Sequence, residues 1–303
     1  MSNFKSRNVI MGNFKSRNVI MSNFQSGDVI NKKEHLTVLN EYNGGLFSSS
    51  FVILFNLVKY YKKYLTTPDL VDTKTMFYKY NPFEYSGYLN SSHSIINSFY
   101  KFDSNNINID NVNNVILDWD AQFDSYNILD FKNINQFIQK YFTPSDEIES
   151  YINIIEKEYN IDYDNTCVLF FRGNDKITET PNMCSHEDII DKGKKILETN
   201  PNIRFLIQSD ETEFIEKCKS VFINNIVFDN YCCHINTNRR LSIQLITNDK
   251  LSVFKYGKYF LAISYIMSKC KYVVCTTGNC SLWIVLFRGN CEGIYQNKDK
   301  IWC

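Results

Sequence analysis

The chain has 303 residues, of which 44% are hydrophobic and 15% aromatic, and its 33 Lys and Arg balance its 33 Asp and Glu. This length accommodates two domains of ordinary size, and the hydrophobic content excludes an intrinsically disordered protein. A net charge of zero gives no sign of the basic surface with which proteins bind nucleic acids, so we expect no nucleic-acid partner.

The ten cysteines all lie at or after Cys167 and include no CxxC pair. The nearest cluster of metal ligands, Cys232-Cys233-His234, lacks a second pair at the spacing of structural zinc sites, so we expect no metal. We expect buried, reduced thiols, which favour a reducing compartment and a cytoplasmic location. The N-terminal segment contains no apolar signal-peptide core and the apolar run 51–58 is too short to cross a bilayer, so we expect no transmembrane segment.

Residues 1–30 are a tandem decapeptide repeat with the copies MSNFKSRNVI, MGNFKSRNVI and MSNFQSGDVI. The copies are too short to stack as a solenoid, whose units have at least about 20 residues. We expect a mobile tail without a catalytic role. The alternative is an oligomerising or targeting arm.

The segment that follows alternates between strand and helix signals. Leu36–Leu39 is predicted to be a strand and leads into the loop Asn43-Gly44-Gly45. Further on, the patterns predict a strand at Val115–Leu117 and a helix at Phe131–Tyr141. Between them, apolar residues at helical spacing predict a helix with one buried face, formed by Phe51, Leu54, Phe55 and Val58.

Thr143-Pro144-Ser145 breaks the chain, and Ser145 is a predicted cap for a helix that carries Ile148 and Ile152 on one face. We place a domain boundary here, which gives an N-terminal domain at 31–145 and a C-terminal domain at 146–303.

The C-terminal half repeats the alternation more regularly. The predicted strands are Cys167–Phe171, Ile203–Ile207, Ile226–Phe228, Tyr272–Cys275 and Gly293–Tyr295. The predicted helices are Glu187–Glu198, Glu211–Val221, Tyr259–Ser268 and Ser281–Phe287. Alternation of strands and helices is typical of parallel sheets with right-handed crossovers. We therefore expect an α/β fold with two Rossmann-like domains that face each other across a cleft.

The first strand of that half ends in charged residues, Arg172-Gly173-Asn174-Asp175-Lys176, and Glu179 follows. In an open α/β sheet, ligands bind beyond the carboxyl ends of the strands. Arg and Lys at such a place suit an anionic diphosphate, and Glu179 is a candidate base in the same pocket. The alternative is a surface turn with ordinary solvated charges.

Three segments of this half resemble signatures of the fucosyltransferase superfamily of GT-B glycosyltransferases, and most closely those of the α1,6-fucosyltransferases. The first family signature is a strand ending in His-Val-Arg-Arg-x-Asp-Lys-x-x-Thr-Glu; here Arg172, Asp175 and Lys176 stand in the same order and a Thr–Glu pair, 178–179, follows. The second is a strand ending in Thr-Asp-Asp, here Ser209-Asp210-Glu211. The third is a strand reading Val-Cys-Thr before a small polar loop, here Val274–Asn279. More weakly, Asn43-Gly44-Gly45 is similar to the Gly-rich first loop of the family's N-terminal domain.

The resemblance implies a GT-B-like fold and inverting, metal-independent transfer of fucose from GDP-fucose to a hydroxyl of a glycan or glycoconjugate. It implies no cofactor beyond this nucleotide-sugar donor. Arg172 would neutralise the diphosphate, Glu179 would be the base and Lys176 its neighbouring cation. The acceptor-side loop would be Asn43, Gly44 and Gly45. The further donor-binding residues would be Asp175, Asp210, Thr276, Thr277, Gly278 and Asn279.

Several roles stay open at this point. Asp210 either fixes the base or ribose of the nucleotide or caps the following helix, and the cap is the favoured interpretation. Asp175 is predicted to lock the Arg172 loop through hydrogen bonds. His186, which follows the predicted cap Ser185, and His234, in a polar loop, are set aside as leading candidates for the base.

The chain departs from the family signatures at positions that matter for activity. Gly173 replaces the second Arg of the first signature, and Phe170 replaces its His. Gly278-Asn279 replaces a Ser–Ser pair, and Ile263 stands where the family carries an acidic residue. These departures motivate an alternative, a catalytically inactive glycosyltransferase-like protein that binds a glycan or a partner protein. A third hypothesis is an interaction protein that assembles through its N-terminal repeats; the sequence does not determine the oligomeric state.

Overall fold

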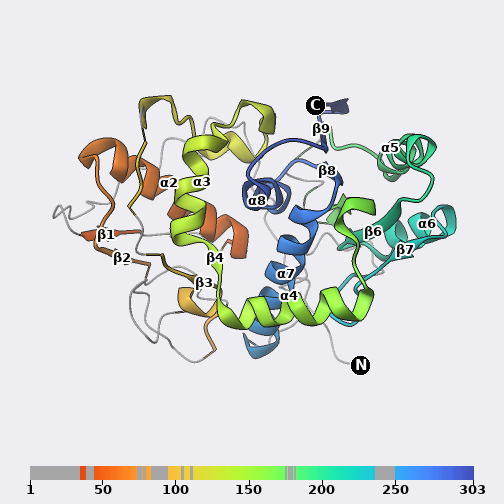
Figure 1. Ribbon diagram of the computed structural model, residues 1–303, viewed down its shortest axis with the longest axis horizontal. Helices are drawn as coiled ribbons and strands as arrows, with labels where there is room; N and C mark the ends of the chain where they lie inside the picture. The colour runs from red at the N-terminus through yellow and green to blue at the C-terminus, as the bar shows by residue number, and fades with distance from the viewer. Residues whose placement is uncertain are drawn as a thin grey trace, which may run out of the picture.

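The computed structural model describes residues 35–38, 44–73, 77, 80–82, 95–103, 106–109, 112–174, 176, 180, 182–235 and 250–303. Its largest sheet has the strand order β10-β9-β8-β5-β6-β7 (Figure 1). Neighbouring strands are parallel except for β10, which is antiparallel to β9. The strands are β5 (Thr166–Phe171), β6 (Arg204–Ser209), β7 (Asn225–Ile226), β8 (Tyr272–Thr276), β9 (Ile294–Lys298) and β10 (Ile301–Trp302). The expected α/β fold class is confirmed.

The order of the strands defines a switch point beside β5. From β5 the chain adds β6 and then β7 on one side, and it crosses to the other side to add β8 and then β9. This order is that of a Rossmann-like sheet. In such sheets a ligand crevice forms at the carboxyl ends of the two strands where the order reverses, here β5 and β8.

Helices cover both faces of this sheet, because successive residues of a strand point to opposite sides. One face packs against α5 (His186–Thr199) and α6 (Thr212–Val221), and the other contributes to the core that contains α4 (Asp146–Tyr159), α7 (Lys250–Lys269) and α8 (Asn279–Arg288). The strand residues in the first core include Leu169, Ile207 and Val274, and those in the second include Val168, Leu206 and Val273. Burial on both faces explains why β5 is apolar along most of its length.

The N-terminal part contains a second parallel unit. The strands β1 (His35–Thr37) and β2 (Leu70–Asp72) pair in parallel and are joined through α2 (Leu46–Tyr64). A Rossmann-like sheet beside a smaller parallel βαβ unit agrees with the expected GT-B-like fold class. The remaining elements are α3 (Phe131–Tyr141), the antiparallel pair β3 (Tyr100–Lys101) and β4 (Thr143–Pro144), and 3-10 helices at Ile96–Ser98, Val112–Asn114, Trp119–Gln122, Tyr126–Ile128 and Tyr163–Asn165.

Helix α8 joins the N-terminal part to the main sheet. Its residues from Asn279 to Leu286 are all buried, as expected for a helix surrounded by other elements. The indole of Trp283 is fully buried, donates a hydrogen bond of 2.9 Å to the carbonyl of Phe47 in α2, and packs on the ring of Phe142. One hydrophobic core therefore contains residues from both sides of position 145. The domain limits expected from the sequence stay a prediction.

Most of the predicted elements are present, with three differences. The segment Val115–Leu117 is not a strand: it follows a 3-10 helix without regular structure. The helix predicted at Tyr259–Ser268 begins earlier, at Lys250, and the predicted strand Ile226–Phe228 is the shorter β7. The sequence analysis did not identify β2, β3, β4 and β10.

The helix caps agree with the sequence. The hydroxyl of Ser145 accepts a hydrogen bond from the backbone N–H of Ile148, and Ser185 forms a reciprocal capping box with Asp188. The repeat at 1–30 lies outside the described residues, so the expectations for it stay predictions.

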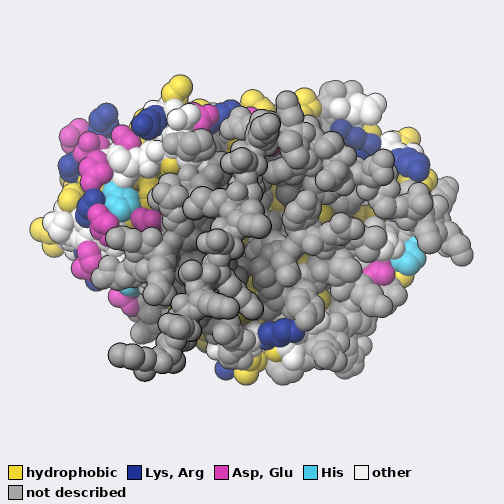
Figure 2. Space-filling model, turned by 180° about the vertical axis from the view of Figure 1, so that it is seen from behind, with side chains coloured by type: hydrophobic (Ala, Val, Ile, Leu, Met, Phe, Trp, Pro, Cys, Tyr) yellow, Lys and Arg dark blue, Asp and Glu magenta, His cyan; other side chains and the backbone are white. Residues whose placement is uncertain are grey.

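The surface and the thiols complete the description. On the face shown in Figure 2, acidic and basic side chains of described residues are intermixed along the margin. No helix in the described ranges is both long enough and apolar enough to span a bilayer. All ten cysteines are described, and none forms a disulfide. Burial raises the pKa of the Cys218, Cys270 and Cys275 thiols to about 12, so these groups stay protonated at neutral pH.

The packing of Trp283 makes a prediction for stability. Trp283→Ala removes a fully buried ring and the hydrogen bond to α2, and we expect it to lower the free energy of unfolding by about 3–5 kcal/mol. The measurement is chemical denaturation followed by circular dichroism. The control is Ile223→Ala, because Ile223 is 97% exposed and its truncation is expected to change stability by less than about 0.5 kcal/mol. Equal effects of the two substitutions would contradict the role assigned to α8.

Candidate functional site

The candidate site lies at the switch point of the main sheet. Arg172 and Gly173 leave the carboxyl end of β5, and Thr276 ends β8. Thr277 and Gly278 then lead into α8, which begins at Asn279. The structure therefore places the first and third sequence signatures on neighbouring strand ends, as the βα pattern predicts.

Asp210, at the end of β6, holds the backbone and the side chain that leave β5. One carboxylate oxygen lies 3.3 Å from Nε of Arg172, and the other accepts a hydrogen bond of 3.1 Å from the N–H of Gly173. The Asp210 carbonyl also accepts a hydrogen bond from the side chain of Asn174. The side chain of Asp210 is 8% exposed and that of Arg172 is 19% exposed, so each charge depends on the other to offset the cost of burial.

The guanidinium of Arg172 also reaches the third signature. Its Nη1 lies 3.2 Å from the sulfur of Cys280, which is in the first turn of α8. The planar guanidinium therefore bridges the exit of β6 and the start of α8, across the switch point. A fixed fork of N–H donors at such a place suits a phosphate group.

Glu211 forms a second set of contacts beside the first. One of its carboxylate oxygens accepts a hydrogen bond of 2.8 Å from the N–H of Asn174, and the other lies 2.8 Å from Nε2 of His186. The ring of His186 packs edge-on against Phe171 and near Phe214. The sequence analysis set His186 aside and gave Glu211 no role of its own. The only sequence signal for the pair was the acidic position next to Asp210.

The carboxylate of Glu211 explains the glycine at position 173. A Cβ atom added to Gly173 would lie 2.0 Å from Oε1 of Glu211, which is far inside van der Waals contact. The space next to this backbone is therefore filled by an acidic group that is paired with His186. A second arginine, as in the family signature, does not fit at position 173 beside this conformation of Glu211.

The turn between β8 and α8 is held by the N-terminal part of the chain. The N–H of Gly278 donates to the carbonyl of Gln122, and the hydroxyl of Tyr126 donates to the carbonyl of Gly278. The side-chain amide of Asn279 donates to Ser48 at 3.0 Å and to the side chain of Gln122 at 2.8 Å. The first turn of α8 is thus fixed by the first turn of α2, which follows Gly44 and Gly45.

Two buried oxygens at this turn have no hydrogen-bond partner among the described residues: Oγ1 of Thr276 and Oδ1 of Asn279. Gly278 has φ of 131°, and a Cβ added to it would meet no atom of the described residues within 4 Å. Buried polar atoms are nearly always hydrogen-bonded in proteins. Unpaired polar atoms next to open space at a helix N-terminus fit a site that is completed by a polar ligand.

Tyr256, on α7, also belongs to this region. Burial raises the pKa of its hydroxyl well above the ordinary value; Cys232 and Asp210 raise it further, and Arg172 opposes them. The hydroxyl therefore stays protonated at neutral pH. The sequence analysis did not identify this residue, because it lies in the half of α7 that was not predicted.

The other predicted site residues have the following positions. Lys176 is described. Its backbone N–H donates a hydrogen bond of 2.7 Å to the carbonyl of Gly173, which closes a tight turn after β5. Asp175, Glu179 and Asn43 lie outside the described residues, so their roles stay predictions. Within the ranges that the structure describes, His, Cys, Asp and Glu side chains form no group that could hold a metal ion.

Two interpretations change. Asp210 is not a helix cap: the N-cap of α6 is Glu211, without a side-chain cap bond, and Asp210 instead binds Arg172 and the N–H of Gly173. Secondly, one residue separates Lys176 from the pair Thr178-Glu179, whereas the family signature has two. Glu179 is thus one residue nearer to Lys176 than the resemblance implies.

Comparison with known proteins gives a distant likeness of fold. No family model and no curated protein matches the chain. A solved structure of NodZ α-1,6-fucosyltransferase co-crystallised with GDP has a TM-score of 0.34 and 10% identity, over 52% of this chain and 45% of that chain. The structure of the same enzyme soaked with GDP-fucose has a TM-score of 0.34 and 9% identity, over 53% of this chain and 48% of that chain. The structure of a selenomethionine form of NodZ from Bradyrhizobium has a TM-score of 0.41 and 9% identity, over 80% of this chain and 88% of that chain.

In the first two of these alignments, the chain spans less than half of the length of the solved structure. Similarity at this level describes an overall arrangement of elements.

The contact between Gly173 and Glu211 makes a prediction for stability. Gly173→Ala forces its new methyl group into the Glu211 carboxylate, and we expect a loss of about 1–3 kcal/mol in the free energy of unfolding. In the double variant Gly173→Ala/Glu211→Ala, the clash is absent. The double variant should therefore be more stable than the sum of the two single losses predicts, by at least about 0.5 kcal/mol.

The measurement is a double-mutant cycle by urea denaturation of the four proteins. Strict additivity of the two substitutions would show that Glu211 does not occupy the space next to Gly173 in solution.

Proposed function

We propose that this protein is a glycosyltransferase that binds a nucleoside diphosphate sugar of the GDP-fucose type at the carboxyl ends of β5 and β8. It transfers the sugar, with inversion and without a metal ion, to a hydroxyl of a glycan or glycoconjugate. The observation that carries this proposal is the guanidinium of Arg172, which is held between Asp210 and Cys280 at the switch point of a Rossmann-like sheet. The resemblance of three ordered signatures to the α1,6-fucosyltransferases supports the choice of donor.

Binding of the diphosphate needs donors more than net charge. Arg172 is paired with Asp210, so the pair is neutral as a unit, and the planar guanidinium carries N–H donors in the geometry that suits phosphate oxygens. Lys176 adds a positive charge on the same loop. The N-terminus of α8 adds backbone N–H groups and the favourable end of the helix dipole.

The chemical step requires a base and a stabilised leaving group. In the proposed mechanism, the carboxylate of Glu179 takes the proton of the acceptor hydroxyl as its oxygen attacks the anomeric carbon from the face opposite the phosphate. The bond between the anomeric carbon and the phosphate oxygen breaks, and GDP leaves with the electron pair. Arg172 and Lys176 stabilise the charge that develops on the diphosphate.

A second candidate function is supported by a specific observation. The family signature has a second cation where this chain has Gly173, and the neighbouring space holds the carboxylate of Glu211. A site with one cation fewer stabilises a leaving diphosphate less well. The second candidate is therefore a non-catalytic relative that binds a nucleotide or a glycan without turnover.

Ligand binding is tested by thermal unfolding of the protein with GDP, GDP-fucose, GDP-mannose, UDP and UDP-sugars. At about 100 times the Kd, a ligand of the native state stabilises it by ~2.7 kcal/mol, which raises the Tm by several degrees. We expect a rise with GDP and GDP-fucose that Arg172→Ala abolishes, because the substitution removes the directed donors. Lys194→Ala, an exposed cation on α5, is the control and should keep the full shift. A flat panel would contradict the proposed donor.

Turnover separates the two candidate functions. Glu179→Gln removes the proposed base without changing its size, so we expect transfer to slow by at least about 100-fold while the GDP-dependent rise in Tm is unchanged. Glu198→Gln on α5 is the matched control and should be as active as the wild type. Donor binding without transfer or donor hydrolysis in the wild type, with a panel of acceptors, would support the non-catalytic relative.

A further inference from the structure

A pocket lies at the end of the main sheet where the strands β8 and β9 begin. Arg172 lies at the opposite end, where the strands finish. The volume of the pocket is about 220 Å³. The rings of Tyr272 and Tyr295, from the starts of β8 and β9, form one side. The other side is the C-terminal half of α5, which contributes Lys192, Lys195, Ile196 and Thr199, together with Asn200.

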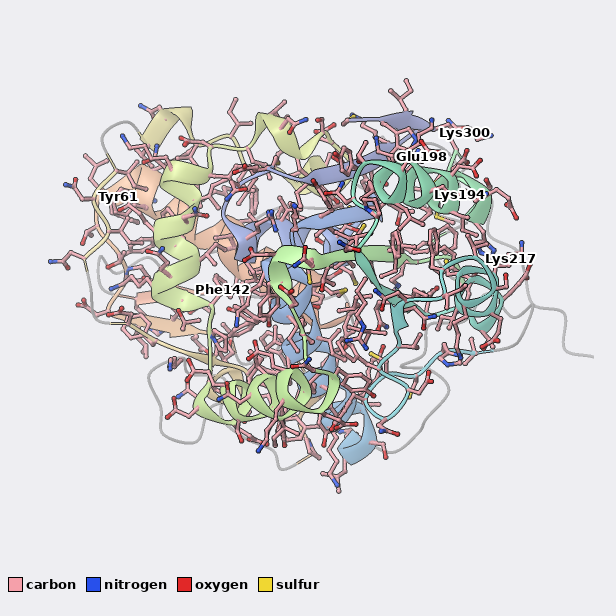
Figure 3. The ribbon with its side chains drawn as sticks, turned by 45° about the vertical axis from the view of Figure 1, so that its right-hand side comes forward. Tyr61, Phe142, Lys194, Glu198, Lys217 and Lys300 are labelled. Carbon is pink, nitrogen blue, oxygen red and sulfur yellow. The ribbon has the colours of Figure 1, made fainter. Side chains whose placement is uncertain are left out.

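The residues that line this pocket include two cations and no acid. The ammonium group of Lys192 lies 4.0 Å from the centre of the Tyr295 ring and 5.4 Å from that of Trp302. Neither Lys192 nor Lys195 forms an ion pair within the described part of the chain. Lys194 differs: it points outward from the same helix and pairs with Asp191 at 3.0 Å (Figure 3). The pocket therefore carries a positive charge that no ion pair among the described residues neutralises.

The surroundings of Lys192 disfavour its charged form. Burial lowers the pKa of Lys192, and the neighbouring charge of Lys195 lowers it further. Both effects cost free energy in the charged state, and an anion placed near both ammonium groups would offset them. The dipole of α5 does not stabilise the charge of Lys192, because the dipole acts within the last turn of a helix and Lys192 lies two turns before the end of α5.

The neutral polar groups of the pocket are occupied by the protein itself. The amide nitrogen of Asn200 donates to the carbonyl of Ile196 and to the hydroxyl of Thr199, and its oxygen lies 3.5 Å from the hydroxyl of Tyr272. Recognition of a ligand therefore falls to the two ammonium groups and to the tyrosine side chains. The rings offer flat apolar surface, and the lysines offer charge.

We propose that this pocket binds a phosphate monoester of a single six-membered ring, with the ring against Tyr272 and Tyr295 and the phosphate between Lys192 and Lys195. A phosphate monoester carries a charge of about −1.5 to −2 at neutral pH, which matches two ammonium groups. Pockets for drug-sized ligands usually exceed about 300 Å³, so a volume of about 220 Å³ suits one substituted ring. The ring is either that of a sugar or an aryl group, and the two sources share this chemistry.

The test measures Kd for the full chain by ligand-observed NMR with phenyl phosphate, glucose 6-phosphate, inorganic phosphate, phenol and glucose. We expect at least one ring phosphate to bind several-fold more tightly than inorganic phosphate and much more tightly than the neutral rings. Lys192→Met keeps the apolar stem and removes the charge, and it should weaken this binding about tenfold. Lys194→Met is the control on the same helix and should bind as the wild type does. The preferred ring phosphate then identifies the source.

Further variants separate this pocket from the candidate donor site. Arg172→Ala should leave the ring-phosphate Kd unchanged, whether or not the proposed glycosyltransferase function holds. Tyr295→Leu should weaken the ring phosphates and leave inorganic phosphate within about twofold, because it removes the ring and its contact with Lys192 but leaves both ammonium charges in the pocket. The proposal is overturned if Lys192→Met binds as the wild type does, if Lys194→Met loses as much as Lys192→Met, or if neutral rings bind as tightly as their phosphates.

Discussion

The pairing of β5 with β6 fixes the geometry on which the candidate site depends. Phe171 lies opposite Ser209, the last residues of the two strands, so the chain that leaves β5 passes directly beside Asp210 and Glu211. The two carboxylates accept hydrogen bonds from the backbone N–H groups of Gly173 and Asn174 and thereby hold the loop in one conformation. A shift of the register by one residue would turn each β6 side chain to the opposite face of the sheet and separate these groups. The identity of residue 173 follows from this pairing, because a side chain there would collide with Glu211.

A second constraint comes from the other end of the sequence. The first turn of α8 is held by Gln122 and Ser48, which precede it by 157 and 231 residues. Trp283 anchors the same helix to α2. The orientation of the helix N-terminus is therefore set by the N-terminal part, while the guanidinium beside it is set by β6. A ligand at this place contacts groups whose positions are fixed by both parts of the chain.

Local patterns in the sequence predicted what depends on near neighbours, and they failed where the outcome depends on distant ones. The apolar run of β5, the caps Ser145 and Ser185 and the whole of α3 were recognisable from residues within a few positions. Val115 and Leu117 are buried and Ile116 is exposed, which is the alternation of a strand, but they form no ladder with any described strand. Gly257 weakens the helical pattern of α7, yet a Cβ there would meet the ring of Tyr80 at 2.9 Å. The Glu211–His186 pair joins residues 25 positions apart, the N-cap of α6 and the first residue of α5, so local patterns did not predict the contact.

The candidate donor site and the Lys192 pocket would recognise phosphate through different interactions. At the switch point, the guanidinium of Arg172 faces the carboxylate of Asp210, and Glu211 lies 2.8 Å from Nε2 of His186. Affinity there depends on directed N–H groups that are already in place, and such preorganised donors lose little free energy when a ligand binds. At the opposite edge, Lys192 and Lys195 supply net charge on flexible side chains. Binding at that edge should be weaker and more sensitive to salt, because the Coulomb attraction of half-exposed charges is screened. Raising the ionic strength should therefore weaken ligand binding at the Lys192 pocket more than ligand binding at the candidate donor site.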